Sequence, residues 1–479
     1  MPEQARRSSA PPTVWPGFRF RALDSATWAI GGGLILVAIY ATLRTLAVPE
    51  VVLLAWAALA VVLTIASPLA GLTILAAIGP FTEALTDDAR ITAVPFVLAA
   101  LGLGTLVALA RLAVARQLPR VPLPVALAVV LFIGTLSAVG LSALWYGPQR
   151  GLEALQLWVP GIGGGLTVLF AAWLIGREGE YRPLAVVVGS ITLAASLSVV
   201  DVLLNGVIRE SAFGWLLRSE VGPERLTGVI PAPNAAATIF LVALGPAAAA
   251  VLFAAHPRLR LLALIASAIL LTAILLTYSR SALLALVIIA VLLAWRFRGW
   301  RALAGVAAAV LAIGIAVLAI PRLGVLREVP FWADEARLGA WSASIRMWLD
   351  APLTGHGFRS FEWLHLQYGS TLDAPHNEWL RFFAEGGVAV GIAALAVVLS
   401  GLLATLRGRD WLAGAGAAGL TAVALMAAFN NPFLYAQVTV AAFLVVGGAS
   451  AAVPYGHATV PPGRSVTERP TRREADRTL

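Results

Sequence analysis

The chain has no cysteine and no lysine, and charged residues make up only 12% of it. The absence of cysteine excludes disulfide bonds, a thiol nucleophile and a cysteine-ligated zinc site. Hydrophobic residues account for 59% of the 479 residues, and the mean hydropathy is +0.87. A soluble domain cannot bury this much apolar surface. The composition therefore predicts a polytopic membrane protein, with lipid as the solvent for most of its surface.

The apolar residues fall into about fourteen stretches, with about twelve as the alternative count, and a helix needs about 20 such residues to cross a bilayer. The predicted spans are 26–43, 51–67, 69–82, 91–110, 121–144, 154–176, 184–204, 234–255, 261–276, 282–295, 302–320, 382–405, 411–428 and 433–452. They predict an all-α bundle, in which the glycine-rich run Gly161–Gly165 allows close helix packing. A flexible gap that admits lipid is the alternative for that run.

All 34 basic residues are arginine, so the arginines define the membrane topology. Short arginine-rich connections stay on the cytoplasmic side. These connections contain Arg111, Arg116, Arg120, Arg177, Arg182, Arg258, Arg260, Arg296, Arg298, Arg301, Arg407 and Arg409. They share one side with the N-terminal segment 1–25 only if the short stretch 69–82 crosses, which predicts that both termini are cytoplasmic. The net charge of +9 then reflects anchoring and does not indicate nucleic-acid binding.

Two non-cytoplasmic segments are much longer than the others, and they divide the chain. The predicted parts are a bundle of about eleven spans at 26–320 with the outward loop 205–233, a cap loop at 321–381, C-terminal spans at 382–452, and a disordered cytoplasmic tail at 453–479. Long ordered loops often carry function, so we expect the chemistry on this outer face.

The 321–381 segment predicts a helical extracytoplasmic cap. Within RLGAWSASIRMWL, apolar side chains recur on one helical face, and such a helix can lie on the outer leaflet. They are Leu338, Trp341, Ile345, Trp348 and Leu349. The following APLTGHGF indicates a turn, and FEWLHLQY a second short helix. A loop that merely covers the bundle is the alternative.

Arg225 and Asn234 form the first candidate site on this face. Asn234 precedes Ala235 where a helix N-cap is expected, and Arg225 comes before a proline-rich entry. A capped helix start beside a guanidinium is a natural anion site. A plain cap with an interfacial arginine is the alternative, which we favour for Asn234 but not for Arg225.

Arg280 is the second candidate, because it lies between apolar runs in LLTYSRSALLAL. A charged side chain costs about 2.5–3.5 kcal/mol at the centre of a membrane helix and less near its end. Pairing with a buried phosphate or carboxylate would offset this cost. Snorkelling of the side chain to the lipid headgroups is the alternative.

His376 is the third candidate, in a proline-started turn before the twelfth predicted span, close in sequence to Glu378 and Arg381. Taken alone, a histidine in such a loop is more often an ordinary surface residue. No histidine pair or carboxylate cluster at ligand spacing accompanies it, so neither a metal nor another cofactor is predicted.

Taken in order, these motifs resemble the O-antigen ligase and polymerase superfamily of bacterial envelope glycosyltransferases. The resemblance covers about 220 to 430. Its motifs are Arg225-Leu-Thr-Gly228 with Pro233-Asn234, then Ser279-Arg280-Ser281, then Arg337…Trp341 with Asp350-Ala-Pro352-Leu-Thr-Gly355-His-Gly357, and finally His376-Asn377-Glu378 with Glu385-Gly386-Gly387. The order of the set carries the resemblance, since each motif alone is common.

The resemblance implies transfer of a glycan from undecaprenyl diphosphate to an acceptor hydroxyl at the periplasmic face of the bacterial inner membrane, independently of metal. The acceptor is lipid A-core in ligases and another lipid-linked repeat unit in polymerases, and the sequence leaves these two open. Family knowledge implies essential roles for Arg225, Arg280 and His376.

The chemistry of the residues fits this assignment. As the glycosidic bond breaks, negative charge develops on the diphosphate, and fixed guanidiniums in a water-poor cleft stabilise it. We expect Arg225 and Arg280 to hold the diphosphate and His376 to remove the acceptor proton or orient the hydroxyl, with Asp373 and Glu378 as reserve bases. The expected substrate-binding residues are Arg337, Arg346, Asn234, Asn377 and Glu378.

Two other classes of function remain open. A transporter or flippase of lipid-linked saccharides would also need many spans and outward arginines, but transporters usually show internal repeats, and none is evident here. A non-enzymatic assembly scaffold would tolerate replacement of the outward arginine and histidine residues.

Overall fold

The computed structural model describes residues 68–81, 123–176, 182–204, 226–227, 232–253, 257–297, 335–407 and 411–451. These residues are helical almost throughout and contain no β-strand, which confirms the all-α prediction. Outside the described residues lie Arg225, the predicted spans 26–43, 51–67, 91–110 and 302–320, and the predicted segments 1–25 and 453–479.

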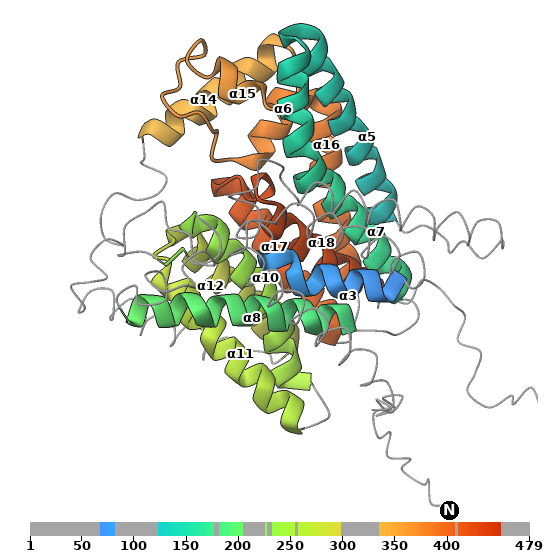
Figure 1. The fold of residues 1–479 in the computed structure, drawn as a ribbon, viewed down its shortest axis with the longest axis vertical. Coiled ribbons are helices and arrows are strands. Elements are labelled where there is room, and N and C mark those ends of the chain that lie inside the picture. Colours follow the sequence, from blue (N-terminus) through green and yellow to red (C-terminus); the bar gives the residue numbers. More distant parts are fainter. Residues whose placement is uncertain are drawn as a thin grey trace, which may run out of the picture.

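The described helices follow one another along the chain in the order that Figure 1 shows. Their bounds are α3 Pro68–Ile78, α5 Leu123–Tyr146, α6 Pro148–Trp158, α7 Gly164–Gly176, α8 Arg182–Leu203, α10 Pro233–Phe253, α11 Pro257–Leu276, α12 Arg280–Phe297, α14 Glu335–Asp350, α15 Ser360–Leu364, α16 Glu378–Arg407, α17 Trp411–Phe429 and α18 Ala436–Ala451. A π-helical segment, η3 (Val159–Gly163), joins α6 to α7, and short 3-10 turns follow α3 (η2, Gly79–Phe81) and precede α18 (η7, Pro432–Leu434).

Within the described part of the chain, six helices are long and apolar enough to cross a membrane. They are Leu123–Tyr146, Pro148–Leu174, Arg182–Leu203, Pro233–Leu252, Pro257–Leu276 and Glu378–Leu406, and shorter apolar helices occur at Arg280–Trp295, Ala413–Phe429 and Ala436–Gly448. The chain is therefore a helical membrane protein, and its full number of spans stays a prediction.

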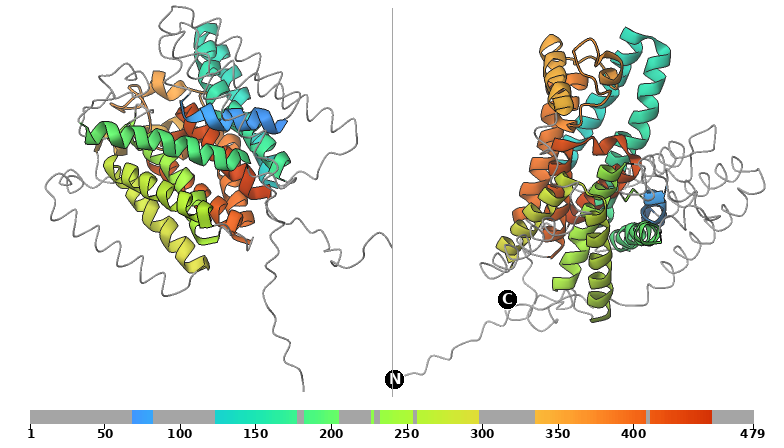
Figure 2. Two further views of the ribbon diagram at one scale, coloured as in Figure 1. Left: turned by 60° about the horizontal axis from the view of Figure 1, so that its bottom comes forward. Right: turned by 90° about the vertical axis from the view of Figure 1, so that its left-hand side faces the viewer.

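Helices α10, α17 and α18 form the centre of the bundle, and α5, α6 and α16 extend from it toward α14 and α15 (Figures 1 and 2). Glycines permit the close contacts that this packing needs. A Cβ at Gly161 would lie 2.7 Å from the carbonyl oxygen of Phe433, and one at Gly165 would overlap Thr439 and Phe443 of α18. The predicted close packing at Gly161–Gly165 is thus confirmed.

Helices α3 and α8 lie across the bundle, steeply inclined to α5 (Figure 1). The Ser190 hydroxyl of α8 donates to the carbonyl oxygen of Ala77 in α3 at 2.5 Å, which joins the two helices. These two helices correspond to the spans predicted at 69–82 and 184–204. Because both lie across the other helices, it stays a prediction that these two stretches cross the membrane.

The described ends of six helices meet at one end of the bundle. Helices α10, α12, α16 and α18 begin there, while α11 and α17 end there, and short hydrogen bonds connect these ends. For example, Glu378 at the start of α16 donates its N–H to the carbonyl of Asn430, just after α17, at 3.2 Å. This alternation of starts and ends is what the predicted topology requires. The side of the membrane that it faces stays a prediction.

The predicted helix, turn and short helix before α16 are all present, as α14, the 351–359 turn and α15. The face of α14 that packs on the protein carries small or flexible side chains, Ala340, Ala343 and Met347, which contact Phe361 and Ala384. The larger apolar residues singled out in the sequence lie elsewhere on α14, and several of them are exposed.

The turn before α15 fills a break in α16. Gly387 has φ 73° and ψ −174°, which interrupts the helix with a conformation that suits only glycine. His356 and Gly357 donate their backbone N–H groups to the carbonyls of Ala384 and Glu385, at 3.0 and 2.9 Å. The residue after the break donates its N–H to the same turn at 2.8 Å. The Gly355/Gly357 motif and the Glu385-Gly386-Gly387 motif are therefore one structural unit.

Candidate functional site

A cavity of about 470 Å³ lies where the helix ends converge. Its polar lining comes from α10, the segment before α16, the first turns of α16 and the connection between α17 and α18. These polar residues are Asn234, Arg359, Glu362, Asp373, His376, Arg381, Glu385, Asn430, Asn431 and Tyr435. The volume is typical of a pocket for a small molecule or for the end of a larger substrate.

A hydrogen-bonded chain ties one wall of the cavity to the start of α12. The Ser279 hydroxyl donates to Asn234 Oδ1 at 2.8 Å and lies 3.2 Å from the Ser281 hydroxyl. Asn430 Nδ2 donates to Ser281 Oγ at 3.1 Å. Two cavity-lining amides, from α10 and from the end of α17, thus bracket the serines on either side of Arg280.

The N-cap prediction for Asn234 is wrong. Helix α10 begins at Pro233, one residue earlier, and the Asn234 side chain accepts its hydrogen bond from Ser279 instead of from its own helix. A contact with a residue distant in sequence therefore replaces the local cap.

Arg280 begins α12, at the helix junction that the sequence predicted. Its side chain is half-buried, and its Nη1 is buried without a hydrogen-bond partner among the described residues. Tyr278, just before it, has a positive φ of 51°, so the chain turns sharply between α11 and α12. A buried guanidinium nitrogen without a partner is suited to an anionic ligand, because each unpaired donor is costly to leave unsatisfied.

His376 lies in the cavity wall just before α16, with a positive φ of 49°. Asn377 caps α16, because its Oδ1 accepts the N–H of Leu380 at 3.1 Å. A positive φ is uncommon outside glycine and indicates that the local packing determines the backbone. Asn377 is not among the cavity-lining residues, and its side chain serves the helix start that positions His376.

Arg381 lies between two buried carboxylates in the first turns of α16. It forms an ion pair with Glu378, and its Nε is 3.8 Å from Glu385 Oε2. All three side chains are almost completely buried, and the guanidinium lies 5.3 Å from the ring centroid of Phe358. Arg381 and Glu385 line the cavity, whereas Glu378 lies behind them.

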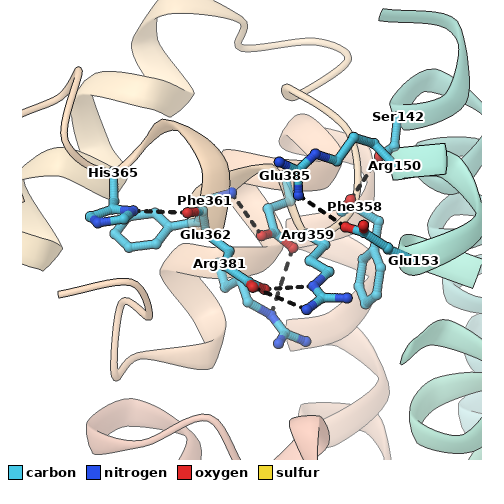
Figure 3. A network of polar contacts seen from close by, with 10 residues as sticks. All are labelled: Ser142, Arg150, Glu153, Phe358, Arg359, Phe361, Glu362, His365, Arg381 and Glu385. Carbon is cyan, nitrogen blue, oxygen red and sulfur yellow. Dashed lines mark hydrogen bonds and ion pairs between the residues drawn. The ribbon is translucent and has the colours of Figure 1, made fainter. Parts of the chain in front are cut away.

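Arg359 and Glu362 form a second ion pair in the cavity wall (Figure 3). Arg359 donates to both carboxylate oxygens of Glu362, at 2.5 and 3.0 Å. These hydrogen bonds raise the pKa of the Arg359 guanidinium above its ordinary value and keep it charged. The N–H of Phe361 donates to Glu385 Oε1 at 3.2 Å, which fixes this pair relative to α16.

Arg337 and Arg346 of α14 are not among the residues that line the cavity. Arg337 Nη1 donates to the carbonyl of Phe429 at 3.4 Å, at the end of α17. Arg346 is exposed and donates to the carbonyl of Tyr368 in the cap. Both side chains thus contact backbone carbonyls of other segments.

In the part of the chain that the structure describes, no group of three or more His, Cys, Asp or Glu residues is arranged to hold a metal ion. Arg225 lies outside the described residues, but Leu226 directly after it donates its N–H to the carbonyl of Leu276 at 2.9 Å. This backbone bond brings the described residue Leu226 to the end of α11, shortly before Arg280 in the chain.

Residues 265–395 match the family model described as O-antigen ligase. This match supports an O-antigen ligase-like family. No curated protein matches the chain. The matched region contains the start of α12, helices α14 and α15, the turn with His376 and the first turns of α16, and so supplies much of the cavity wall.

The cavity wall is completed by residues outside the matched region. Asn234 comes from α10, and Asn430 and Asn431 follow α17. The Oδ1 atoms of Asn430 and Asn431 are buried without a hydrogen-bond partner among the described residues. The sequence interpretation missed both asparagines and Arg359. Two amides and a proline between apolar spans were the available signal, because polar side chains at membrane depth are costly unless they have a function.

Proposed function

We propose that this protein is a membrane glycosyltransferase that moves a glycan from undecaprenyl diphosphate to an acceptor hydroxyl at the outer face of the plasma membrane, without a metal ion. The observation that carries the proposal is the cavity lined by His376, whose wall residues Asn234 and Asn430 hydrogen-bond to the serines on either side of Arg280. Arg280 itself is not among the cavity-lining residues; it is half-buried, and its Nη1 has no partner among the described residues. The family match over residues 265–395 supports an O-antigen ligase-like or polymerase-type enzyme in general.

In the proposed reaction, the acceptor hydroxyl attacks C1 of the donor sugar and the bond from C1 to the diphosphate oxygen breaks. The electron pair of that bond leaves with undecaprenyl diphosphate. Arg280, together with Arg225, stabilises the negative charge that develops there, an effect typically worth a factor of about 100 to 1000 in rate for each fixed donor. His376 takes the hydroxyl proton, and Asp373 in the same wall is the reserve base.

The amide groups of the cavity are suited to a glycan. The Oδ1 atoms of Asn430 and Asn431 are unpaired acceptors among the described residues, and sugar hydroxyls are donors. A substrate hydroxyl would remove the cost of burying these oxygens without a partner. We therefore assign the asparagines to the orientation of the sugar. Glu378, which forms an ion pair with Arg381 behind the cavity wall, is assigned to holding Arg381 in place.

The test uses purified protein in liposomes with a fluorescent, lipid-linked oligosaccharide donor and separate acceptors. A glycolipid acceptor and a second donor molecule distinguish ligase from polymerase, the other activity that the family supports. We expect covalent product with the wild type and loss of it with His376→Ala. His365→Ala is the matched control, because the His365 ring contacts the carbonyl of Glu362 and does not line the cavity.

Three results would contradict the proposal. Movement of the donor between leaflets without a covalent product would indicate a transporter or flippase. Unchanged transfer in His376→Ala would exclude the assigned role of the imidazole. Loss of transfer in EDTA that Mg²⁺ restores would contradict metal independence.

A further inference from the structure

The cap contacts α5 well below its outer end. The N–H of Phe358 donates to the carbonyl of Ala138 at 3.0 Å, and the Ser142 hydroxyl donates to the carbonyl of Phe358 at 2.7 Å. Ala138 precedes the end of α5 at Tyr146 by about 12 Å, at about 1.5 Å per residue. Helix α5 has no charged residue, and Leu144, nearer its end, is 76% exposed. The turn before α15 is therefore set into the apolar part of the bundle, where its backbone groups need protein partners.

Helix α14 lies at a similar level, along the ends of two spans. Trp348 packs on Phe383 of α16 with ring centroids 5.1 Å apart, and Trp341 packs on Phe429 at the end of α17 at 6.4 Å. Phe383 falls within the Glu378–Leu406 helix that is long and apolar enough to cross a membrane. Helix α14 thus lies alongside α16 and the end of α17, and not only beyond the ends of the spans.

The surface of α14 is divided into three sectors. One packs on the protein. The second is apolar and exposed: Leu338, Ile345 and Leu349 are 45%, 42% and 65% exposed and fall within about 40° of one another around the helix. The third is polar and exposed, and contains Glu335 and Arg346.

We propose that the apolar sector of α14 contacts the acyl chains of the leaflet on the cavity side, with the polar sector facing water. A helix at a lipid–water boundary requires this side-by-side division of its exposed surface. A helix that stood clear of the membrane would leave three large apolar side chains in water beside charged ones. The cap is then a membrane-embedded part of the fold, and the cavity beneath it opens near the acyl-chain boundary.

The absence of cysteine makes a direct test available, because a single introduced cysteine is labelled without background. Ile345→Cys and Leu349→Cys probe the apolar sector, and Glu335→Cys is the matched control on the same helix. Each full-length variant carries a nitroxide label in vesicles of phosphatidylethanolamine and phosphatidylglycerol. Collision rates with oxygen, which concentrates in lipid, and with a neutral nickel chelate, which stays in water, are then measured.

We expect the ratio of oxygen to nickel accessibility to be several-fold higher at positions 345 and 349 than at 335. Equal nickel accessibility at all three positions would overturn the proposal, because the apolar sector would then face water. Low accessibility to both reagents at 345 and 349 would also overturn it, since another protein surface would then cover the sector. All three replaced side chains are exposed, so the variants are expected to fold, and a thermal melt of each confirms that they do.

Discussion

Asn430 Nδ2 donates a hydrogen bond to the Ser281 hydroxyl at 3.1 Å across 149 positions of sequence. The bond links the end of α17 to the first turn of α12, and Asn430 also accepts the N–H of Glu378 through its backbone carbonyl. One residue thereby fixes the starts of α12 and α16, and with them Arg280 and the turn that carries His376. We infer that the geometry of the proposed site depends on this asparagine.

Replacing Asn430 with alanine should lower both stability and transfer. The Ser281 hydroxyl loses a partner in a buried position, which costs about 1–3 kcal/mol of unfolding free energy. Because the start of α12 is no longer held and the proposed contact of Asn430 with the sugar is lost, we expect transfer to fall at least about tenfold, roughly the effect of 1.4 kcal/mol on the barrier. Thermal unfolding in detergent and the transfer assay measure the two effects. Ser137→Ala, which removes an exposed hydroxyl from α5, should change neither, and a wild-type rate in Asn430→Ala would contradict the linkage.

Replacing Arg280 separates charge from geometry. Arg280→Ala should reduce transfer by about 100- to 1000-fold without a comparable change in melting temperature, because the guanidinium is expected to act on the developing diphosphate charge. Arg280→Lys keeps the charge but loses the bidentate geometry, so partial activity is expected. Arg260→Ala, at the other end of α11, is the control. Equal activities of the Arg280 and Arg260 variants would refute the assigned role.

The break in α16 can be tested by adding a single methyl group. At Gly387, with φ 73°, a Cβ would overlap the carbonyl oxygen of Leu353, so Gly387→Ala should destabilise the protein by about 2–4 kcal/mol through strain and loss of the docked turn. At Gly140 in α5, nothing lies within 4 Å of the position that a Cβ would take. Gly140→Ala should therefore be neutral or slightly stabilising. Similar melting temperatures for the two variants would show that the turn does not fill the break.

Arg346 was predicted from the sequence to bind substrate, but it lies outside the cavity, so its replacement tests that prediction. Its exposed side chain contacts the carbonyl of Tyr368 and does not line the cavity. We expect Arg346→Ala to retain transfer within about twofold and to lose at most about 1 kcal/mol of stability. A large rise in the apparent KM for the donor would instead restore the original assignment.

The sequence predicted the features that depend on neighbouring residues. The spacing of the apolar residues predicted the helices around the site, and glycine and proline predicted the turn before α15, because span length and backbone conformation depend on nearby residues. The junction at Arg280 was predicted for the same reason. Asn234 was assigned to the wrong partner because its hydrogen bond to Ser279 depends on how α10 and α12 pack. Asn430 was missed because its role comes from residues distant in sequence.

The docking of the turn into the break at Gly387 limits how related proteins can be recombined. Carbonyls of α16 beside the break are satisfied by N–H groups of the turn, and the N–H of Phe358 finds its acceptor on α5, so neither the turn nor this part of α16 has complete backbone pairing alone. A chimaera that exchanges the cap for that of a relative would leave backbone groups of the turn and of α16 unpaired unless the new turn matched the break. An exchange that respects this pairing would have to transplant the cap, the first turns of α16 and the facing part of α5 together.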